Sequence, residues 1–457
     1  MGRSGRGRRR RGRNRGGFDR FDGGGGGNGP YGGGWGGGPG GPGGPGGPGG
    51  QGGPGGPGGP GGPGGYGGGP QPPRDLANAI VVEGVFEPTQ DNAGFLRSVK
   101  EDFDDTPNDA FVHANVARRF ALRPGSMIKG LAIPGRGRQG KPMLERIDSI
   151  EGLSVEDAMR LPTFKQLTSI DPRDRFVLEG DDGDINLRVI DLLTPLGRGQ
   201  RALIVAPPRS GKTVILEKIA NRIVRGYPDV HLMVALVDER PEEATHFKRA
   251  VPAPAEVIAS TNDEAGDRHL RVAELVNERA KRLVETGRHV VVLIDSLTRL
   301  GRAYNLETRG SGRTLSGGLD AKVLEKPKAF FAAARNCEGG GSLTIVATAL
   351  IDTGSRLDQV IFEEFKGTGN MELVLSRTLS DRRIYPAIDI NASGTRREEL
   401  LLGEATLRKI GLLRRVLNRM KPVEAMELLV RKLKETRSNT EFLARFDAVG
   451  AAAVEDD

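Results

Sequence analysis

The sequence predicts an α/β fold with a mostly parallel sheet, preceded by a small closed β-barrel and by a disordered amino-terminal tail. Three observations carry this prediction. Residues 1–74 consist largely of Gly, Pro and Arg, residues 77–150 hold five short strand-like runs, and residues 181–457 alternate apolar runs with helical patterns. Residues 151–180 form a polar connector punctuated by proline.

The tail holds 39 of the 70 glycines and ten arginines against two acids, Asp19 and Asp22, so it carries the whole net charge of +8. With so little to bury, it cannot offset the entropy cost of folding. Its Arg-Gly part is typical of segments that hold single-stranded RNA by charge and stacking. A solubilising tail without a specific partner is the alternative. The aromatic side chains available for stacking are Phe18, Phe21, Tyr31, Trp35 and Tyr66.

One cysteine, Cys337, excludes a disulfide framework and most metal sites. The amino terminus lacks the apolar core of a signal peptide, and no uncharged apolar run approaches the length of a membrane span. We therefore expect a soluble protein in the reducing cytoplasm, without a membrane partner.

The five runs before the connector favour a small closed barrel such as the OB-fold, whose open face binds single strands. Phe95 and Arg97, in Gly-Phe-Leu-Arg, together with Phe111 would form a base-stacking platform beside a phosphate contact. The alternative is that these phenylalanines are core residues. The expected strands are 80–86, 94–99, 110–112, 126–133 and 143–150.

A short apolar run at 203–206 leads through Gly-Lys-Thr into a helical pattern, as in a P-loop. A loop between such a strand and helix points backbone N–H groups and the positive end of the helix at a phosphate. Lys212 would reach the β- and γ-phosphates, and the Thr213 hydroxyl would hold Mg²⁺. The strict pattern has Gly where Ala206 stands, so an ordinary lysine in a first helical turn is the alternative.

The remaining pattern continues the parallel sheet, with nucleotides expected at the carboxyl ends of its strands. We expect helices from 241 and over 266–285, and a helical end from about 396. The further expected strands are 231–237, 256–260, 289–294, 342–350, 371–375 and 384–390.

Two acids end such strands. Asp295 closes an apolar run that we expect beside the P-loop strand, where a Mg²⁺-organising carboxylate belongs; capping of the next helix is the alternative. Glu239 would orient and deprotonate the water that attacks the γ-phosphate. A surface salt bridge is the alternative for Glu239 and the preferred reading for Glu242 and Glu243.

Two irregular loops, 308–318 and 351–356, are rich in Gly, Ser and Thr and contain arginine, and we expect both to follow strands on one face. Such loops can approach a phosphate backbone closely, although plain surface loops have the same composition. Arg396 and Arg397 precede the helical end, where an arginine could act on the nucleotide of a neighbouring subunit. These patterns alone do not select which arginine does so.

Seven motifs stand in one order along the chain, and together they resemble the Rho family of bacterial transcription termination factors over about residues 77–446. That family begins its P-loop with Ala-Pro-Pro, which accounts for Ala206. The motifs are Ala-Pro-Pro-Arg-Ser-Gly-Lys-Thr, Val-Asp-Glu-Arg-Pro-Glu-Glu, Leu-Ile-Asp-Ser-Leu-Thr-Arg, Leu-Ser-Gly-Gly-Leu-Asp-Ala, Ala-Leu-Ile-Asp-Thr-Gly-Ser-Arg, Glu-Glu-Phe-Lys-Gly-Thr-Gly-Asn-Met-Glu-Leu and Ile-Asn-Ala-Ser-Gly-Thr-Arg-Arg-Glu-Glu-Leu.

The resemblance implies a homohexameric, RecA-like, ATP-dependent RNA–DNA helicase that loads on nascent single-stranded RNA, favours pyrimidines and displaces RNA polymerase. A NusG-type factor is a further implied partner. The ATP would lie between subunits. The two irregular loops would be pore loops that grip RNA.

The resemblance also assigns residues by motif. Glu239 would be the catalytic base, Lys212 would act on the phosphates, and Arg396 would be an arginine finger in trans. The nucleotide would be held by Arg209, Ser210, Gly211, Lys212, Thr213, Val214 and Arg240, with Tyr385 stacked on adenine, and Mg²⁺ by Thr213 and Asp295. RNA would be bound by Phe95, Arg97, Phe111, Arg313 and Arg356, with Glu364 coupling RNA to ATP.

Two departures from the family pattern concern RNA. Ala93 stands where a second aromatic residue usually precedes Gly-Phe-Leu-Arg, which affects the affinity or pyrimidine preference of the primary RNA site. The small helical domain that usually precedes the barrel has the Arg-Gly tail in its place. We expect this tail to supply RNA affinity by charge.

Overall fold

The computed structural model describes residues 76–307, 314–315, 319–320 and 323–454, with side chains described over 76–307 and 323–446. The predicted tail, the pore-loop residue Arg313 and most of the first irregular loop therefore lie outside the described residues. Among the described residues, no helix combines the length and apolar character needed to cross a membrane.

The first folded part is a closed five-stranded barrel, as predicted. Its strands follow the order β1-β2-β3-β5-β4 and enclose a small apolar core that includes Phe86, Leu96 and Leu144. Alternation along each strand directs one side chain inward and the next outward. The barrel consists of β1 (Ile80–Pro88), β2 (Gly94–Arg97), η1 (Val99–Glu101), β3 (Ala110–Val112), α1 (Ala114–Arg119), β4 (Met127–Ile133), η2 (Arg138–Gly140) and β5 (Met143–Ile150).

The connector contains short elements that pack on the second part of the chain. Phe164 and Phe176 are buried, and strand β6 pairs with β15 at the edge of the main sheet. The connector is thus polar and punctuated by proline in sequence, but its buried phenylalanines attach it to the second part of the chain. The elements are α2 (Val155–Arg160), η3 (Phe164–Gln166), β6 (Ser169–Ile170) and β7 (Arg175–Phe176), the last paired with β8 (Leu196–Gly197).

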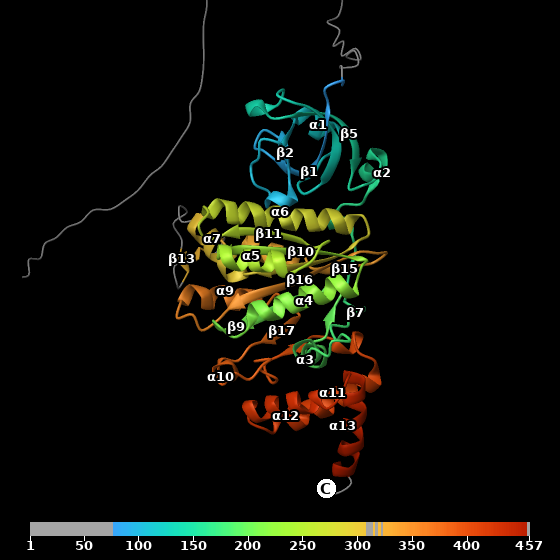
Figure 1. The fold of residues 1–457 in the computed structure, drawn as a ribbon, viewed down its shortest axis with the longest axis vertical. Coiled ribbons are helices and arrows are strands. Elements are labelled where there is room, and N and C mark those ends of the chain that lie inside the picture. The colour runs from blue at the N-terminus through green and yellow to red at the C-terminus, as the bar shows by residue number, and fades with distance from the viewer. Residues whose placement is uncertain (1–75, 308–313, 316–318, 321–322, 455–457) are drawn as a thin grey trace, which may run out of the picture. The chain divides into compact units, whose positions relative to one another are not determined.

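The second part is built on a nine-stranded sheet whose main path is β11-β10-β12-β16-β9-β17-β18 (Figure 1). The first six strands of this path are parallel, and β18 is antiparallel. This confirms the predicted mostly parallel sheet. Its strands are the connector strand β6, β9 (Arg201–Ala206), β10 (Val230–Glu239), β11 (Glu256–Thr261), β12 (His289–Asp295), β15 (Arg335–Cys337), β16 (Ser342–Leu350), β17 (Met371–Val374) and β18 (Gly394–Thr395), beside a separate hairpin of β13 (Thr314–Leu315) and β14 (Leu319–Asp320).

Helices cover both faces of this sheet, because successive strand residues point to opposite faces. Ile204 packs into the apolar cluster under α3, α4 and α5, whereas Leu203 and Val205 pack under α6, α7 and α9. The helices are α3 (Ile185–Leu193), α4 (Lys212–Gly226), α5 (Pro241–Ala250), α6 (Gly266–Glu285), α7 (Leu297–Glu307), α8 (Glu325–Ala332), α9 (Arg356–Lys366), α10 (Arg377–Asp381), η4 (Glu398–Leu400), α11 (Glu404–Asn418), α12 (Pro422–Lys434) and α13 (Asn439–Val454).

Three expectations about this part were wrong. Strand β12, which ends at Asp295, is not beside the P-loop strand β9, because β16 lies between them. Residues 384–390 form no strand; only Ile388 makes an isolated bridge, since Pro386 lacks an N–H and Asp389 accepts backbone N–H groups in a turn. The loop that begins at residue 308 follows helix α7 rather than a strand.

The barrel is anchored to the second part through the segment after η1. Phe103 is fully buried in the apolar cluster on the α6 face of the sheet. The Asp102 carboxylate accepts the Ala259 N–H at 2.9 Å, and the Phe103 carbonyl accepts from Arg271 of α6 at 2.9 Å. These contacts hold the barrel loop against helix α6.

Candidate functional site

A cavity of about 770 Å³ opens where β9 passes into α4, at the carboxyl end of the parallel strands. The loop between them bends through two left-handed residues, Arg209 with φ 64° and Gly211 with φ 95°. The Ser210 hydroxyl is buried and donates to the Pro207 carbonyl at 2.7 Å, which holds the loop closed on itself. Helix α4 begins at Lys212, so its first N–H groups face the cavity, as a phosphate site requires.

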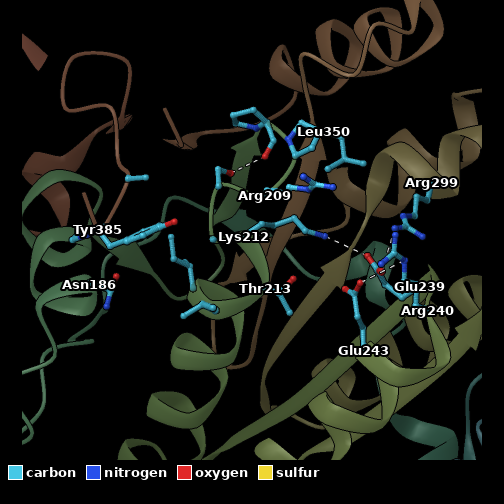
Figure 2. A pocket seen from close by; sticks show the side chains of 18 residues that line it. Asn186, Arg209, Lys212, Thr213, Glu239, Arg240, Glu243, Arg299, Leu350 and Tyr385 are labelled. Carbon is cyan, nitrogen blue, oxygen red and sulfur yellow. Dashed lines mark hydrogen bonds and ion pairs between the residues drawn. The ribbon is translucent and has the colours of Figure 1, made fainter. Parts of the chain in front are cut away.

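The cavity gathers every residue predicted to bind nucleotide. It is lined by Asn186, Pro207, Pro208, Arg209, Ser210, Gly211, Lys212, Thr213, Val214, Ile215, Glu239, Arg240, Glu243, Arg299, Leu350, Tyr385, Pro386 and Ala387. Figure 2 shows Tyr385 on one side of the loop and the Glu239 group on the other, with the Lys212 side chain pointing toward Glu239. The half-exposed ring of Tyr385 forms a flat wall suited to stacking.

Lys212 joins the two strand-end acids. Its Nζ lies 3.3 Å from Glu239 Oε1 and forms an ion pair with Asp295. Thr348 of β16 donates to Asp295 Oδ1 at 2.8 Å, and Arg299 of α7 lies 3.2 Å from Glu239 Oε2. Both carboxylates are buried. The preferred surface salt bridge at Glu243 does form, 3.9 Å from Arg240, although both residues also line the cavity.

The contacts of Thr348 and Arg299 with the two acids were not predicted, although the sequence contains a signal for each residue. Thr348 is a polar residue inside the apolar run of β16, and a buried hydroxyl requires a partner. Arg299 stands four residues after Asp295, one turn into the helix that follows β12. Neither signal identifies the partner, because pairing order in the sheet is not visible in the sequence.

Burial raises the pKa of Glu239, and the neighbouring Asp295 carboxylate raises it further, while Lys212 and Arg299 act in the opposite direction. A carboxyl with a raised pKa accepts a proton more readily than an exposed one. The arrangement therefore suits a general base held within reach of a cation.

The residues present also fit a Mg²⁺ ion. The described residues contain no group of three or more His, Cys, Asp or Glu side chains able to hold a metal by themselves. Mg²⁺ at nucleotide sites is bound by one or two protein oxygens together with waters and phosphates. Thr213 at the cavity and Asp295, which pairs with Lys212 of the P-loop, offer that kind of incomplete ligand set.

Arg396 lies away from this cavity. Its N–H donates to the Asn370 carbonyl at 2.9 Å, and the Asn370 side chain accepts the N–H of Arg201 at 2.8 Å. Arg201 begins β9, whereas the P-loop follows the last residue of β9, so roughly 17 Å of strand separates the two ends. Arg397 instead pairs with Asp171, at 2.5 Å.

On the barrel, Phe95 and Phe111 stand opposite each other on β2 and β3, with ring centroids 5.5 Å apart. They belong to a small buried cluster with Ala93 that is separate from the main barrel core. Phe95 and Phe111 are only 6% and 8% exposed, so their burial agrees with the alternative that they are core residues, and their stacking role stays a prediction. The cations that lie over them are Arg97 and Lys141 on Phe95 and Arg138 on Phe111, at 4.9, 5.1 and 5.4 Å.

The predicted phosphate contact, Arg97, is already engaged. Its guanidinium pairs with Glu87 at 2.6 Å, with Asp109 at 2.5 Å and with Asp105. Elsewhere, Arg356 is exposed at the start of α9, directly after the loop that follows Leu350 of the cavity. Glu364 is exposed on the same helix and pairs with Lys328 of α8 at 2.6 Å.

A P-loop cavity with two buried strand-end acids, on a parallel sheet behind a barrel with an aromatic and cationic face, defines a nucleotide-binding ATPase-type protein with an RNA-binding module. Comparison with known families agrees. Residues 186–395 match the ATP synthase alpha/beta family, nucleotide-binding domain, and residues 82–156 match the Rho termination factor, RNA-binding domain.

Curated relatives identify the family. Proteins named transcription termination factor Rho are 49% identical in Aquifex aeolicus, 51% in Cereibacter sphaeroides and 51% in Pseudomonas aeruginosa. The matches cover 81%, 79% and 79% of this chain and 85%, 86% and 86% of those proteins. The chain belongs to the transcription termination factor Rho family.

Solved structures show the same fold in more distant proteins. The ATPase EscN of the enteropathogenic E. coli type III secretion system matches with a TM-score of 0.52 at 20% identity, over 68% of this chain and 79% of EscN. The ATP synthase subunit NeqB from Nanoarcheaum equitans matches with a TM-score of 0.50 at 17% identity, over 62% of this chain and 77% of NeqB.

Proposed function

We propose that this chain is an RNA-stimulated ATPase that moves along nascent single-stranded RNA, separates RNA from DNA and ends transcription by displacing RNA polymerase. The observation that carries the proposal is the coexistence, in one member of the Rho family, of the Lys212 cavity and the aromatic face of the barrel. ATP turnover and RNA binding are thereby supported by different residues of the same chain.

The P-loop residues would hold ATP. Lys212 exchanges its two carboxylate partners for the β- and γ-phosphates, while Ser210, Gly211 and Val214 frame the phosphates and Tyr385 stacks on the base. Arg209 and Arg240 flank the phosphate end of the cavity. Mg²⁺ held by Thr213 and Asp295 would neutralise phosphate charge.

Once Lys212 turns to the phosphates, Glu239 is free to orient a water and take its proton. Its raised pKa and its position at the carboxyl end of β10 support this role. Arg299 then remains as the nearest cation to Glu239 and limits the orientation of its carboxylate.

We place a second part of the site on a neighbouring subunit of a homohexamer. Arg396 lies at the opposite end of β9 from the P-loop, so it cannot complete the cavity of its own chain. A ring in which one subunit's β18 edge faces the next subunit's P-loop would bring Arg396 to the transferred phosphoryl group.

RNA would first bind the barrel, with pyrimidines stacked on Phe95 and Phe111 beside Arg97, and then pass the pore loops that carry Arg313 and Arg356. Glu364 shares helix α9 with Arg356, which fits a role in relaying RNA contact. RNA polymerase and a NusG-type factor are the proposed partners, in the cytoplasm where transcription takes place. The proposed domains are the tail 1–74, the barrel 77–150, the connector 151–180 and the ATPase domain 181–457.

The deciding experiment compares ATP turnover by the full chain with and without a pyrimidine-rich RNA. We expect turnover to rise strongly with RNA. A secretion-type or rotary ATPase would turn over ATP at the same rate in both cases, and an RNA-binding assembly protein would not turn it over in either, so each of these results contradicts the proposal.

A further inference from the structure

Three carboxylates surround the two cations that lie over Phe95. Asp105 contacts both Arg97 and Lys141, so it bridges them. Asp109 lies 2.5 Å from Arg97 and 3.7 Å from Lys141, and Glu87 lies 2.6 Å from Arg97. A face expected to attract RNA phosphate is thus neutralised from within the protein.

The three carboxylates differ in how firmly they are held. The Asp109 side chain is 2% exposed and accepts from the Thr106 N–H at 3.0 Å and the Thr106 hydroxyl at 2.7 Å. The Glu87 side chain is 14% exposed and lies 3.0 Å from Arg271 of α6. The Asp105 side chain is 64% exposed.

Asp105 is therefore the carboxylate that an incoming anion can replace. It lies in the loop between η1 and β3, where its side chain can turn outward without breaking a strand ladder. Its position is close to the anchored Phe103, so the loop itself stays in place while the side chain moves.

The two cations have little other access to solvent. The Arg97 side chain is 10% exposed and that of Lys141 is 7% exposed, and both lie within 5.1 Å of the Phe95 ring centroid. Asp105, which contacts both cations, is the most exposed group beside them, so a nucleotide stacked at this ring would reach them by replacing it.

We infer that Asp105 is a built-in competitor for RNA phosphate at the aromatic face of the barrel, an inference that rests on the proposed RNA-binding role of this face. In the free protein the charges of Arg97, Lys141 and Arg271 are balanced by Glu87, Asp105 and Asp109. RNA displaces the Asp105 carboxylate and takes over its two cations.

The ionisation of Asp105 agrees with this role. Hydrogen bonds from Lys141 and Arg97 lower the pKa of the Asp105 carboxyl, so it remains an anion at neutral pH. Competition of this kind weakens binding of any RNA, because a bound phosphate gains cations only at the expense of an internal ion pair. It also reduces the net number of counterions that RNA releases on binding.

The test is the affinity of the full chain, without nucleotide, for a short fluorescent oligocytidylate at several salt concentrations. In Asp105→Asn we expect about fivefold tighter binding, the size of effect associated with a partly exposed ion pair. The slope of log affinity against log salt should become steeper by about 0.7, which corresponds to one additional phosphate contact on a single strand.

Asp148→Asn is the matched control. Asp148 is an exposed acid of the same barrel, paired with Arg146 at 2.8 Å, and the substitution removes the same charge. Its affinity should stay close to that of the unsubstituted protein. An equal gain in both variants would mean that general charge, rather than competition at Phe95, sets the affinity and would overturn the inference.

Two further results separate the inference from the function beneath it. Unchanged or weaker binding in Asp105→Asn, with the normal unfolding temperature, would show that Asp105 merely holds Arg97 and Lys141 in place and would refute competition. Phe95→Ala tests the face itself: if it leaves affinity unchanged, RNA does not bind there and the proposed RNA face fails together with the inference.

Discussion

Lys212 and Asp295 form an ion pair although their strands are not neighbours. Lys212 follows β9 and Asp295 ends β12, and β16 lies between them with Thr348 bonded to the same Asp295 oxygen that Lys212 contacts. The long lysine side chain spans the width of one strand. The cation of the P-loop thus lies between the two strand-end acids, 3.3 Å from Glu239.

Because Glu239 is buried beside Asp295, we expect Glu239→Gln to lower ATP turnover and to raise stability. Removing the base should reduce ATP turnover by about 10²- to 10⁴-fold. The folded-state pKa of Glu239 is raised, so its ionisation destabilises the fold increasingly as pH rises from the unfolded pKa through the folded one. The neutral Gln should therefore give a higher unfolding temperature at pH 8, measured by calorimetry beside steady-state turnover.

Glu243→Gln serves as the control for this prediction. Glu243 lines the same cavity, but it is partly exposed and lies only 3.9 Å from Arg240. Its substitution should change turnover and unfolding temperature little. Turnover at the normal rate in Glu239→Gln would remove Glu239 from the role of base.

The separation of Arg396 from the P-loop along β9 predicts complementation between two inactive variants. Lys212→Ala and Arg396→Ala should each abolish turnover, the first through the subunit's own cavity and the second through its neighbour's. A mixed ring contains interfaces that combine an intact Lys212 with an intact Arg396. Mixing the purified variants under conditions of subunit exchange should restore part of the ATP turnover, measured against each variant alone.

A result without restored turnover, in mixtures shown by mass to contain both variants, would contradict the assignment of Arg396 to the neighbouring site. As a control, a variant carrying both substitutions should not restore turnover to either single variant, since it supplies neither half of the site.

The sequence predicted the elements that depend on local periodicity and missed those that depend on pairing. The isoleucines of α4 mark the buried face of that helix directly, so the helix after the P-loop was predictable. The near-complete burial of Phe95 was not, because all four residues of β2 are buried and no alternation separates its two faces. Sheet order was not, because crossovers place β16 between β9 and β12 without a signal at Asp295. The carboxylates around Arg97 come from β1 and from the loop before β3, so its engagement was likewise not visible in the sequence.

We expect the contribution of Asp191 of α3 to the free energy of unfolding to depend on pH. Burial raises the pKa of Asp191 to about 6, although Arg175 at 3.7 Å and the N–H groups of Glu179 and Leu178 oppose the shift. Since the ordinary value is 3.8, this group should lower the free energy of unfolding by about 2.5 kcal/mol as pH rises from about 4 to 7.

Asp191→Asn cannot ionise and lacks this dependence. Urea titrations of both proteins at pH 4 and pH 7 measure this. Between the two pH values, the unfolding free energy of the unsubstituted protein should fall by that amount relative to that of Asp191→Asn. A difference that stays constant with pH would contradict the raised pKa.

We expect Phe103 to stabilise the junction between the barrel and the sheet. Its side chain is fully buried in the cluster beneath α6, so Phe103→Ala should lower the free energy of unfolding by about 3–5 kcal/mol. Calorimetry should show this as a lower unfolding temperature. Val81→Ala, an exposed substitution on β1, is the control and should have little effect; equal effects of the two would contradict the anchoring role of Phe103.

Residues 1–74 lie outside the described structure, but their charge supports a prediction about RNA. They carry the entire net charge of +8, and the rest of the chain is neutral. Each cation that contacts a phosphate on a single strand adds about 0.7 to the slope of log affinity against log salt. Deleting residues 1–74 should therefore weaken RNA binding at low salt and flatten this slope.

A tail of the same length with its ten arginines replaced by glutamine separates charge from length. If charge is responsible, this variant should match the deletion rather than the full chain. The two RNA contributions should also be independent, because Asp105→Asn acts at the barrel and should tighten binding by the same factor with or without the tail. Unchanged binding at all salt concentrations after deletion would exclude the tail as a source of RNA affinity and leave the barrel face to supply it alone.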